Sequence, residues 1–352
     1  MISITLFDLR YRARQFLIAV VGASLVFAMS LLLTGLAQGF TVEVQQTVAG
    51  TGAGAWVMAG GAAGRIASLP PVPGPLASLA AAALRVQGVA RVDPVVVAPE
   101  TATLASAVTS IVVVGASPGG LGAATPSTGR PVLHSGQAVV DRSLGLGVGG
   151  HFALSGRPFT VVGTVRGRTL LGGLPDVFVT LGDAQRSIYG GHALVSALLA
   201  SSMPRQVPPG FVAMSDAEVE ARTLAQLAPA VSSIDNSRAF MWVIAVAIVA
   251  ALVYVAALER TRDFAVLKAL GASSTRLFGG LAFQAVVVSL LSAAAASLAA
   301  QFMTGLFAQP VDIPGRAFVI LPVTAVLVGV VSSLAALRKA VSVDPAVAFA
   351  GA

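Results

Sequence analysis

The chain has 352 residues, of which 56% are hydrophobic and only 11% are charged, and its formal net charge is +7. With a mean hydropathy of +0.86, this composition excludes an ordinary soluble globular domain and indicates a membrane protein. The absence of cysteine excludes disulfides and thiolate metal sites. Nine of the 22 Lys and Arg residues flank apolar segments, so the positive charge indicates membrane topology rather than nucleic-acid binding.

Four apolar runs are long enough to cross about 30 Å of hydrocarbon as helices that rise about 1.5 Å per residue. We expect transmembrane helices at residues 16–38, 239–258, 277–307 and 317–337. The third run exceeds the length of one crossing, so it should tilt or project from the bilayer. A cleaved signal peptide is the alternative for the first run. Its apolar stretch is too long for one and no Ala-x-Ala site follows it, which favours an uncleaved anchor.

Basic residues flank the spans on one side of the membrane. They are Arg10, Arg12, Arg14, Arg260, Arg262, Lys268, Arg276, Arg338 and Lys339. If all four runs cross, the positive-inside rule places residues 1–15, 259–276 and 338–352 in the cytoplasm. Residues 39–214 and the short link at 308–316 then lie outside it, and both termini are cytoplasmic.

Residues 39–214 are predicted to form a mixed α+β extracytoplasmic domain, inserted between the first and second spans. Short β-branched runs bounded by Gly, Pro and Asp predict strands. They lie at 95–97, 111–114, 137–140, 159–165 and 177–180, and residues 76–87 predict a helix. From Gly50 to Gly74 there is no periodicity and there are several prolines, so we expect a loop over weak strands.

A stalk helix is predicted over residues 215–238. Ser215 and Glu218 have the spacing of a capping box, which begins a helix. Only Pro229 interrupts the pattern that follows, so we expect the stalk to continue into the second span. Movement of the outer domain would then be transmitted to the membrane.

Two motifs resemble enzyme sites but lack the groups that the chemistry needs. Gly115 to Gly119 fits the Gly-x-Ser-x-Gly nucleophile elbow, yet the residue after the serine is Pro118, which has no N–H for an oxyanion. We expect a turn there. Gly145 to Gly150 fits Gly-x-Gly-x-x-Gly, but two strands with a turn at Gly156 are expected to follow instead of a helix, so no helix N-terminus is available for pyrophosphate.

Other sources of energy or chemistry are also missing from the sequence. The chain has no P-loop, and its three histidines lack the spacing of a helical zinc site. No span carries a charge in its middle, which argues against an ion-coupled carrier. We therefore expect an external source of energy.

The connector at 259–276 has the pattern of a surface helix. Phe264, Leu267 and Leu270 form an apolar stripe, charged residues occupy other faces, and Gly271 can end the helix in the left-handed conformation. On periodicity alone, such a helix either lies on lipid headgroups or docks on another protein.

The connector sequence Glu-Arg-Thr-Arg-Asp-Phe-Ala-Val-Leu-Lys-Ala-Leu-Gly-Ala-Ser, residues 259–273, resembles the cytoplasmic connector of FtsX/MacB-type (type VII, mechanotransmission) ABC transporter permeases. Its usual form there is close to Glu-Arg-x-Arg-Glu-Ile-x-x-Leu-Lys-Ala-x-Gly-Ala. The resemblance extends over the whole chain, through the one-plus-three arrangement of spans. Further matching stretches are Ile111 to Gly119, Val139 to Gly163 and Val343-Asp-Pro345.

The resemblance implies a non-catalytic permease subunit of the bacterial inner membrane that binds no cofactor itself. Two copies would pair and bind two separate ABC ATPase subunits, which hold the ATP and Mg²⁺, because no ATPase domain is fused here as it is in MacB. Membrane lipids would be further partners, and residues 1–15 would form a membrane-surface helix. The residues implied in ATPase coupling are Arg260, Arg262, Asp263, Phe264, Leu267, Lys268, Leu270 and Gly271.

We expect ATP hydrolysis in the partner to drive an extracytoplasmic conformational change that exports or extracts a lipid, lipoprotein, peptide or drug. One alternative is an FtsX-like regulator of an external cell-wall hydrolase, which adds a periplasmic or cell-wall partner. Another is a membrane-tethered sensor or binding protein that works without an ATPase. The sequence identifies neither the substrate nor the ligand site of the outer domain, and residues 50–75 have no clear counterpart in the family.

Overall fold

A computed structural model describes residues 13–105, 107–259, 274–304 and 311–340. The contacts divide the chain into two compact units. Within the described residues, the first, the helical unit, comprises 13–38, 231–259, 274–304 and 311–340. The second, the α/β unit, comprises 39–230.

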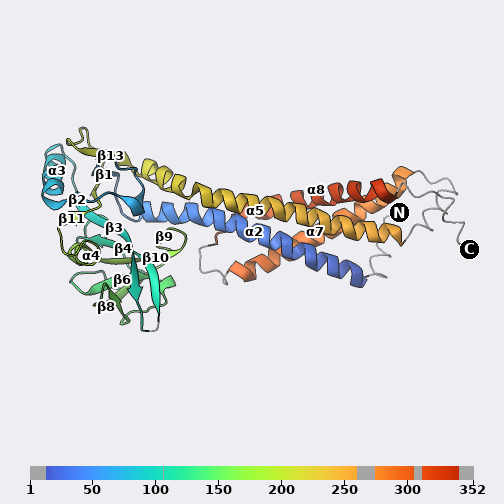
Figure 1. Ribbon diagram of the computed structural model, residues 1–352, viewed down its shortest axis with the longest axis horizontal. Coiled ribbons are helices and arrows are strands. Elements are labelled where there is room, and N and C mark those ends of the chain that lie inside the picture. The colour runs from blue at the N-terminus through green and yellow to red at the C-terminus, as the bar shows by residue number, and fades with distance from the viewer. Residues whose placement is uncertain (1–12, 106, 260–273, 305–310, 341–352) are drawn as a thin grey trace, which may run out of the picture. The chain divides into compact units, whose positions relative to one another are not determined.

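Four long apolar helices form the helical unit: α2 (Ala13–Ala49), α5 (Asp216–Leu258), α7 (Ser274–Met303) and α8 (Gly315–Ala340) (Figure 1). All four are long and apolar enough to cross a membrane. Two of them, α2 and α5, are longer than one crossing needs, and they also contribute residues 39–49 and 216–230 to the α/β unit. Pro229 lies inside α5 without ending it, so the predicted stalk and the second span belong to one helix.

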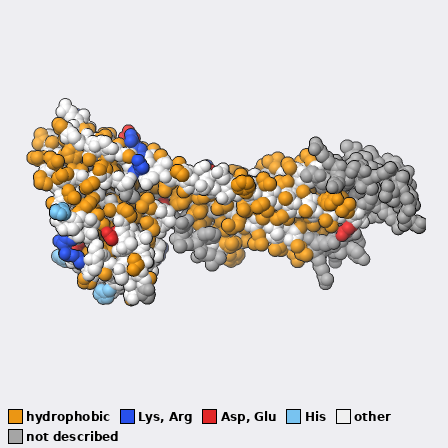
Figure 2. All heavy atoms as spheres, in the orientation of Figure 1, with side chains coloured by type: hydrophobic (Ala, Val, Ile, Leu, Met, Phe, Trp, Pro, Cys, Tyr) orange, Lys and Arg blue, Asp and Glu red, His pale blue; other side chains and the backbone are white. Residues whose placement is uncertain are grey.

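Small side chains fill the core of the helical unit. Ala23, Ala245, Ala285 and Ala325 are completely buried there, which lets the helix backbones approach closely. The Ser332 hydroxyl of α8 donates a hydrogen bond to the Val246 carbonyl of α5, at 3.0 Å. Hydrophobic side chains also cover the visible outer face of the described helices (Figure 2), as a protein surrounded by lipid requires.

The α/β unit is built on a mixed sheet with the strand order β13-β1-β12-β3-β4-β10-β6-β8-β5. The β10–β4 and β6–β8 pairs are parallel; β7 pairs with β3 and β8, and β9 pairs with β10. The strands are β1 (Ala55–Ala59), β2 (Val72–Pro73), β3 (Val92–Thr103), β4 (Val108–Ala116), β5 (Thr128–Gly129), β6 (Gln137–Asp141), β7 (His151–Leu154), β8 (Arg157–Val165), β9 (Thr169–Leu170), β10 (Leu174–Thr180), β11 (Leu194–Val195), β12 (Ala197–Ala200) and β13 (Phe211–Ser215). All five predicted strands are present in this list, and the predicted helix is α3 (Gly74–Val86).

Residues 50–74 are more ordered than the sequence predicted. β1 lies inside the sheet, pairs with β12 on one edge and β13 on the other, and carries the fully buried Trp56. The expectation of a loop over weak strands was therefore wrong for this strand. It has no polar alternation because both of its faces are buried. Pro75 lies in the first turn of α3, where the missing N–H costs nothing, instead of preventing regular structure.

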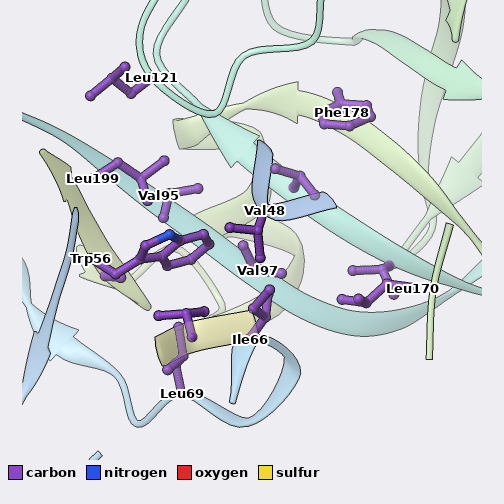
Figure 3. Close-up of a cluster of buried hydrophobic side chains, with 14 of the residues drawn as sticks. Val48, Trp56, Ile66, Leu69, Val95, Val97, Leu121, Leu170, Phe178 and Leu199 are labelled. Atoms are coloured by element: carbon purple, nitrogen blue, oxygen red, sulfur yellow. The ribbon is translucent and has the colours of Figure 1, made fainter. Parts of the chain in front are cut away.

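Hydrophobic clusters cover both faces of the sheet because side chains alternate along each strand. In β3, Val95 and Val97 belong to one cluster and Val96 belongs to another. The first cluster includes Val48 from the end of α2, which lies beside Val97 and near Trp56 (Figure 3). Two helices, α3 and α4 (Leu181–Ile188), contribute to the clusters on the other face.

The start of α5 is fixed to this sheet by hydrogen bonds. The Ser215 N–H donates to the Glu218 carboxylate at 2.8 Å, and the Glu218 N–H donates to the Ser215 hydroxyl at 3.3 Å, which confirms the predicted capping box. The Trp56 indole N–H donates to Asp216 Oδ1 at 3.1 Å. The first turn of α5 is therefore bound to the neighbouring strands β1 and β13.

The close packing of α7 on α8 yields a first prediction. A Cβ added at Gly329 would lie 2.7 Å from the Val286 Cα, whereas a Cβ at Gly22 of α2 would meet its nearest neighbour, Ile248, at 4.0 Å. We expect Gly329→Ala to lower the free energy of unfolding by about 1–3 kcal/mol through overpacking. The matched control, Gly22→Ala, should be neutral or stabilising. Thermal unfolding of the full chain in detergent measures both, and equal midpoints for the two variants would contradict the described packing.

Candidate functional site

The predicted ATPase-coupling surface lies outside the residues that the structure describes. This holds for Arg260, Arg262, Asp263, Phe264, Leu267, Lys268, Leu270 and Gly271, and also for residues 1–12 and for Val343-Asp-Pro345. The connector joins α5, which ends at Leu258, to α7, which begins at Ser274. The coupling role of these residues remains a prediction from the sequence.

Within the α/β unit, the end of α2 is held by a hairpin. We call residues 168–174, which include β9 and lead into β10, the α2-binding hairpin (Figure 1). The carboxylate of Glu43 accepts hydrogen bonds from the Gly173 N–H at 2.7 Å and the Gly172 N–H at 3.0 Å. One turn further along α2, the Thr47 hydroxyl donates to the Thr169 carbonyl at 3.1 Å.

The conformation of the hairpin explains why it receives a carboxylate. Leu171, Gly172 and Gly173 have φ angles of 58°, 84° and 96°, and left-handed residues in succession turn backbone N–H groups toward a common anion. Glycine adopts this conformation without steric cost, whereas Leu171 does so against its Cβ. Glu43 is only 2% exposed, so these two N–H groups replace the water that its carboxylate loses.

The contact continues along one face of α2. Glu43 and Thr47 are four residues apart in α2 and so lie on the same side of the helix. Gly50, the residue after α2, is three positions further on. At Gly50 an added Cβ would overlap the guanidinium of Arg168. Arg168 therefore lies directly against the last turn of α2, where a cation is favourable because the helix dipole is negative at that end.

A buried group of charges lies at the base of the α2-binding hairpin. Asp176 of β10 is fully buried, and its Oδ2 is 4.0 Å from Arg168 Nε. Neither carboxylate oxygen of Asp176 has a hydrogen-bond partner among the described residues. Burial raises the pKa of Asp176 to about 7; Arg168 opposes this rise, while Glu43 and Asp141 add to it.

Two neighbours of Asp176, Asp141 and Arg168, have partners for their charges. Asp141 accepts hydrogen bonds from the Ser143 N–H and hydroxyl and from the Arg168 N–H, at 2.7–2.9 Å. The Arg168 guanidinium lies 5.0 Å from the centre of the Phe178 ring, a cation–π distance. Burial lowers the pKa of Arg168, and the two aspartates oppose that change. Arginine still carries its charge at neutral pH, because its ordinary pKa lies far above that range.

A cavity of about 590 Å³ lies beside the end of α2. Its wall is the loop at 117–126, which is tied to its surroundings by three hydrogen bonds. Arg91 donates to the Gly119 carbonyl at 2.7 Å, the Leu121 N–H donates to Asp93 at 2.9 Å, and the Gly122 N–H donates to the Thr51 carbonyl at 2.8 Å.

Apolar side chains predominate in the lining of this cavity. Arg91 is the single ionisable side chain among the described residues that line it, and most of the others are Ala, Gly, Pro, Val and Leu. A volume of several hundred Å³ is typical of sites for small molecules. A ligand held there would contact residues 49–52, at the end of α2.

The motifs that resembled enzyme sites form turns and strands. The Gly120 N–H donates to the Ser117 carbonyl at 2.9 Å, so the predicted turn at Gly115 to Gly119 is confirmed. After Gly150 the chain enters β7 and β8, the two strands that the sequence predicted, which are joined through Gly156. Within the described residues, no group of three or more His, Asp or Glu side chains is arranged to hold a metal ion.

Glu43, Arg168 and Asp176 were not among the site residues predicted from the sequence. One signal for Glu43 was available, because it is the single charged residue between Gln15 and Ala49. A lone carboxylate at the end of an apolar helix needs a polar partner. Its partners are 129 and 130 positions away in the sequence. The sequence could therefore indicate that Glu43 needs a polar partner, but not that the hairpin provides it.

Four membrane-length apolar helices, with a mixed α/β domain between the first and the second, define a multi-pass membrane protein with a large domain outside the spans. Residues 16–206 match the family model described as the MacB-like periplasmic core domain, and residues 239–345 match the FtsX-like permease C-terminal model. The chain belongs to the FtsX/MacB-type family of ABC transporter permeases.

Similar proteins include two uncharacterized ABC transporter permeases of Mycobacterium tuberculosis. One is 36% identical over 352 residues and the other 35% over 351 residues, and each alignment covers 100% of both chains. An uncharacterized ABC transporter permease of Mycobacterium bovis is also 36% identical over 352 residues, again with 100% of both chains covered.

Two solved structures resemble part of the chain more distantly. The periplasmic region of MacB from Actinobacillus actinomycetemcomitans is 16% identical, with a TM-score of 0.35, and the match covers 48% of this chain and 93% of that one. The extracellular domain of the noncanonic ABC-type transporter YknZ from Gram-positive bacteria is 14% identical, with a TM-score of 0.33, and covers 46% and 98%.

The buried carboxyl of Asp176 predicts an unusual dependence of stability on pH. Its pKa is about 7 in the folded protein and 3.8 ordinarily, so between these values the folded state holds a proton that the unfolded chain has released. The free energy of unfolding should therefore fall as the pH rises through this window, by up to about 1.4 kcal/mol per pH unit.

Asp176→Asn cannot ionise and should lose less stability over that window than the native chain. Thermal unfolding midpoints of the full chain in detergent at a series of pH values measure the difference. Glu100→Gln is the control, since it removes a carboxylate from the same sheet outside the charge group. Parallel pH profiles for the native chain and Asp176→Asn would show that Asp176 does not hold the proton.

Proposed function

We propose that this chain is the permease subunit that couples ATP hydrolysis by separate ABC ATPase subunits to a conformational change of the α/β unit. The family match over the whole chain carries the proposal. The absence of a P-loop in the sequence agrees with it, because the ATP and Mg²⁺ must then be held by a partner. The permease itself would be non-catalytic and would act as a pair of copies with two ATPase subunits.

The connector would receive the movement and the long helices would carry it. Closure of the ATPase subunits on ATP would displace residues 259–276, which follow α5 directly in the chain. α5 is one helix from Asp216 to Leu258, and its first turn is bonded to β1 through Trp56. α2 contributes a second attachment through Glu43 and the α2-binding hairpin. These contacts support transmission between the helices and the sheet without a substrate tunnel through the bilayer.

The transported molecule would be a lipid, lipoprotein, peptide or drug that is exported or extracted on the outer side. The apolar lining of the cavity at 117–126 supports a ligand with an apolar portion, since a single arginine is the charged group of its described lining. In this proposal the α/β unit lies outside the cytoplasm of a bacterial cell and both termini lie inside, as the distribution of basic residues favours.

Copurification tests the proposal. A tagged full chain isolated from its own cells in mild detergent should bring down an ABC ATPase at a stoichiometric level. Phe264→Asp or Leu267→Asp should reduce the recovered ATPase at least about tenfold, because each places a carboxylate into an apolar contact.

Leu79→Asp is the matched control, because it makes the same exchange at an exposed position of the α/β unit outside the cavity lining and should leave ATPase recovery unchanged. If no ATPase is recovered with the native chain, the coupling function is wrong. That outcome would favour the ATPase-independent sensor. If both connector variants retain the ATPase, the connector is not the docking surface.

A further inference from the structure

The outer end of α2 and the α2-binding hairpin meet along an unbroken line of contacts. Phe40 lies against Gly172, Glu43 accepts from Gly172 and Gly173, Thr47 donates to Thr169, and Gly50 lies against Arg168. The helix and the hairpin run in opposite directions, so the tip of the hairpin meets the earlier residues and its base meets Gly50. The same hairpin base contains the buried pair Arg168 and Asp176.

Several polar atoms of this pair lack a hydrogen-bond partner among the described residues. Asp176 is fully buried, and neither of its oxygens, nor Arg168 Nε, has a hydrogen-bond partner among the described residues. An ionised carboxylate without hydrogen bonds is costly in the protein interior, whereas a protonated one is not. The site is therefore better suited to the neutral acid than to the carboxylate.

We propose that a single proton on the Asp176 carboxyl controls how firmly the α2-binding hairpin holds the outer end of α2. With the proton bound, Arg168 remains on Gly50 and the Glu43 contact is undisturbed. When the proton leaves, the new negative charge attracts the Arg168 guanidinium across the present 4.0 Å and away from α2. The same charge repels the carboxylate of Glu43, so both changes weaken the contact with α2.

The surroundings of Asp176 contain few other charges to oppose this effect. Glu43 faces it from α2 and Asp141 from β6, and both disfavour its ionisation; Arg168 favours it. β4, the parallel neighbour of β10, contains no ionisable residue between Val108 and Ala116. The pKa of about 7 that results for Asp176 places the change near neutral pH. The inference does not depend on ATPase docking, because every group in it lies in the α/β unit.

Hydrogen exchange of the full chain in detergent tests the proposal. The measured quantity is the protection of amides 169–174, corrected for the intrinsic exchange rate, between about pH 5 and about pH 8. We expect this protection to fall as the pH rises toward about 7, the pKa of Asp176, approaching tenfold per pH unit if opening releases one proton, and to level off above it. Amides of β3 serve as the internal reference, since they should not follow the same curve unless the whole unit unfolds.

Asp176→Asn should hold the hairpin at its low-pH protection at every pH. Protection that is independent of pH in the native chain, or that keeps its pH dependence in Asp176→Asn, would overturn the proposal. Glu43→Gln gives a second test that does not require Asp176→Asn to fold. Removing the neighbouring negative charge should move the midpoint of the native curve to lower pH. If Glu43 is only structural, protection will fall at all pH values with the midpoint unmoved, and the proposal fails.

Discussion

A carboxylate that is buried away from water needs hydrogen-bond donors in place of the water it loses. In this protein the donors are backbone N–H groups of a turn whose residues have positive φ angles. Glu43 is the single charged residue between Gln15 and Ala49, and its carboxylate accepts hydrogen bonds from the N–H groups of two glycines with positive φ. A buried hydrogen bond to a charged group contributes about 1.5–3 kcal/mol to stability. A buried charged group that is left without a hydrogen-bond partner costs at least as much. These hydrogen bonds fix the position of the hairpin on α2, and Val44 and Val48 of the same helical segment pack into the core of the sheet.

The fold of the α/β unit could be predicted where local residue types determine structure. Runs such as Ile111 to Val114 are β-branched and bounded by breakers, and they are strands as expected. β1 was missed because Ala, Met and Trp in a glycine-rich context carry no period-two signal. A strand that is paired on both edges and covered on both faces needs no such alternation. Its place in the sheet is decided by long-range pairing that the sequence does not display.

Part of the candidate site could likewise be predicted from local sequence, and part could not. The connector residues were found from a local pattern, and the family assignment that followed from it is confirmed by matches over the full chain. Their role in docking is still a prediction. The charge group around Asp176 brings together residues from α2, β6 and β10 together with Arg168. No spacing in the sequence relates these positions, so the group could be recognised only once the sheet had been described.

The register of β1 and β13 has a mechanical consequence for the two long helices. Five residues separate the end of α2 at Ala49 from the start of β1 at Ala55. α5 starts directly after β13 ends at Ser215, and Ala55 is paired with Ser215. Both helices therefore enter the same end of one antiparallel ladder of five residue pairs. Sliding of one helix end along the other would load all five pairs together in shear, whereas spreading the ends apart would open the ladder one pair at a time. The ladder is therefore stiff against piston-like motion and compliant toward splaying.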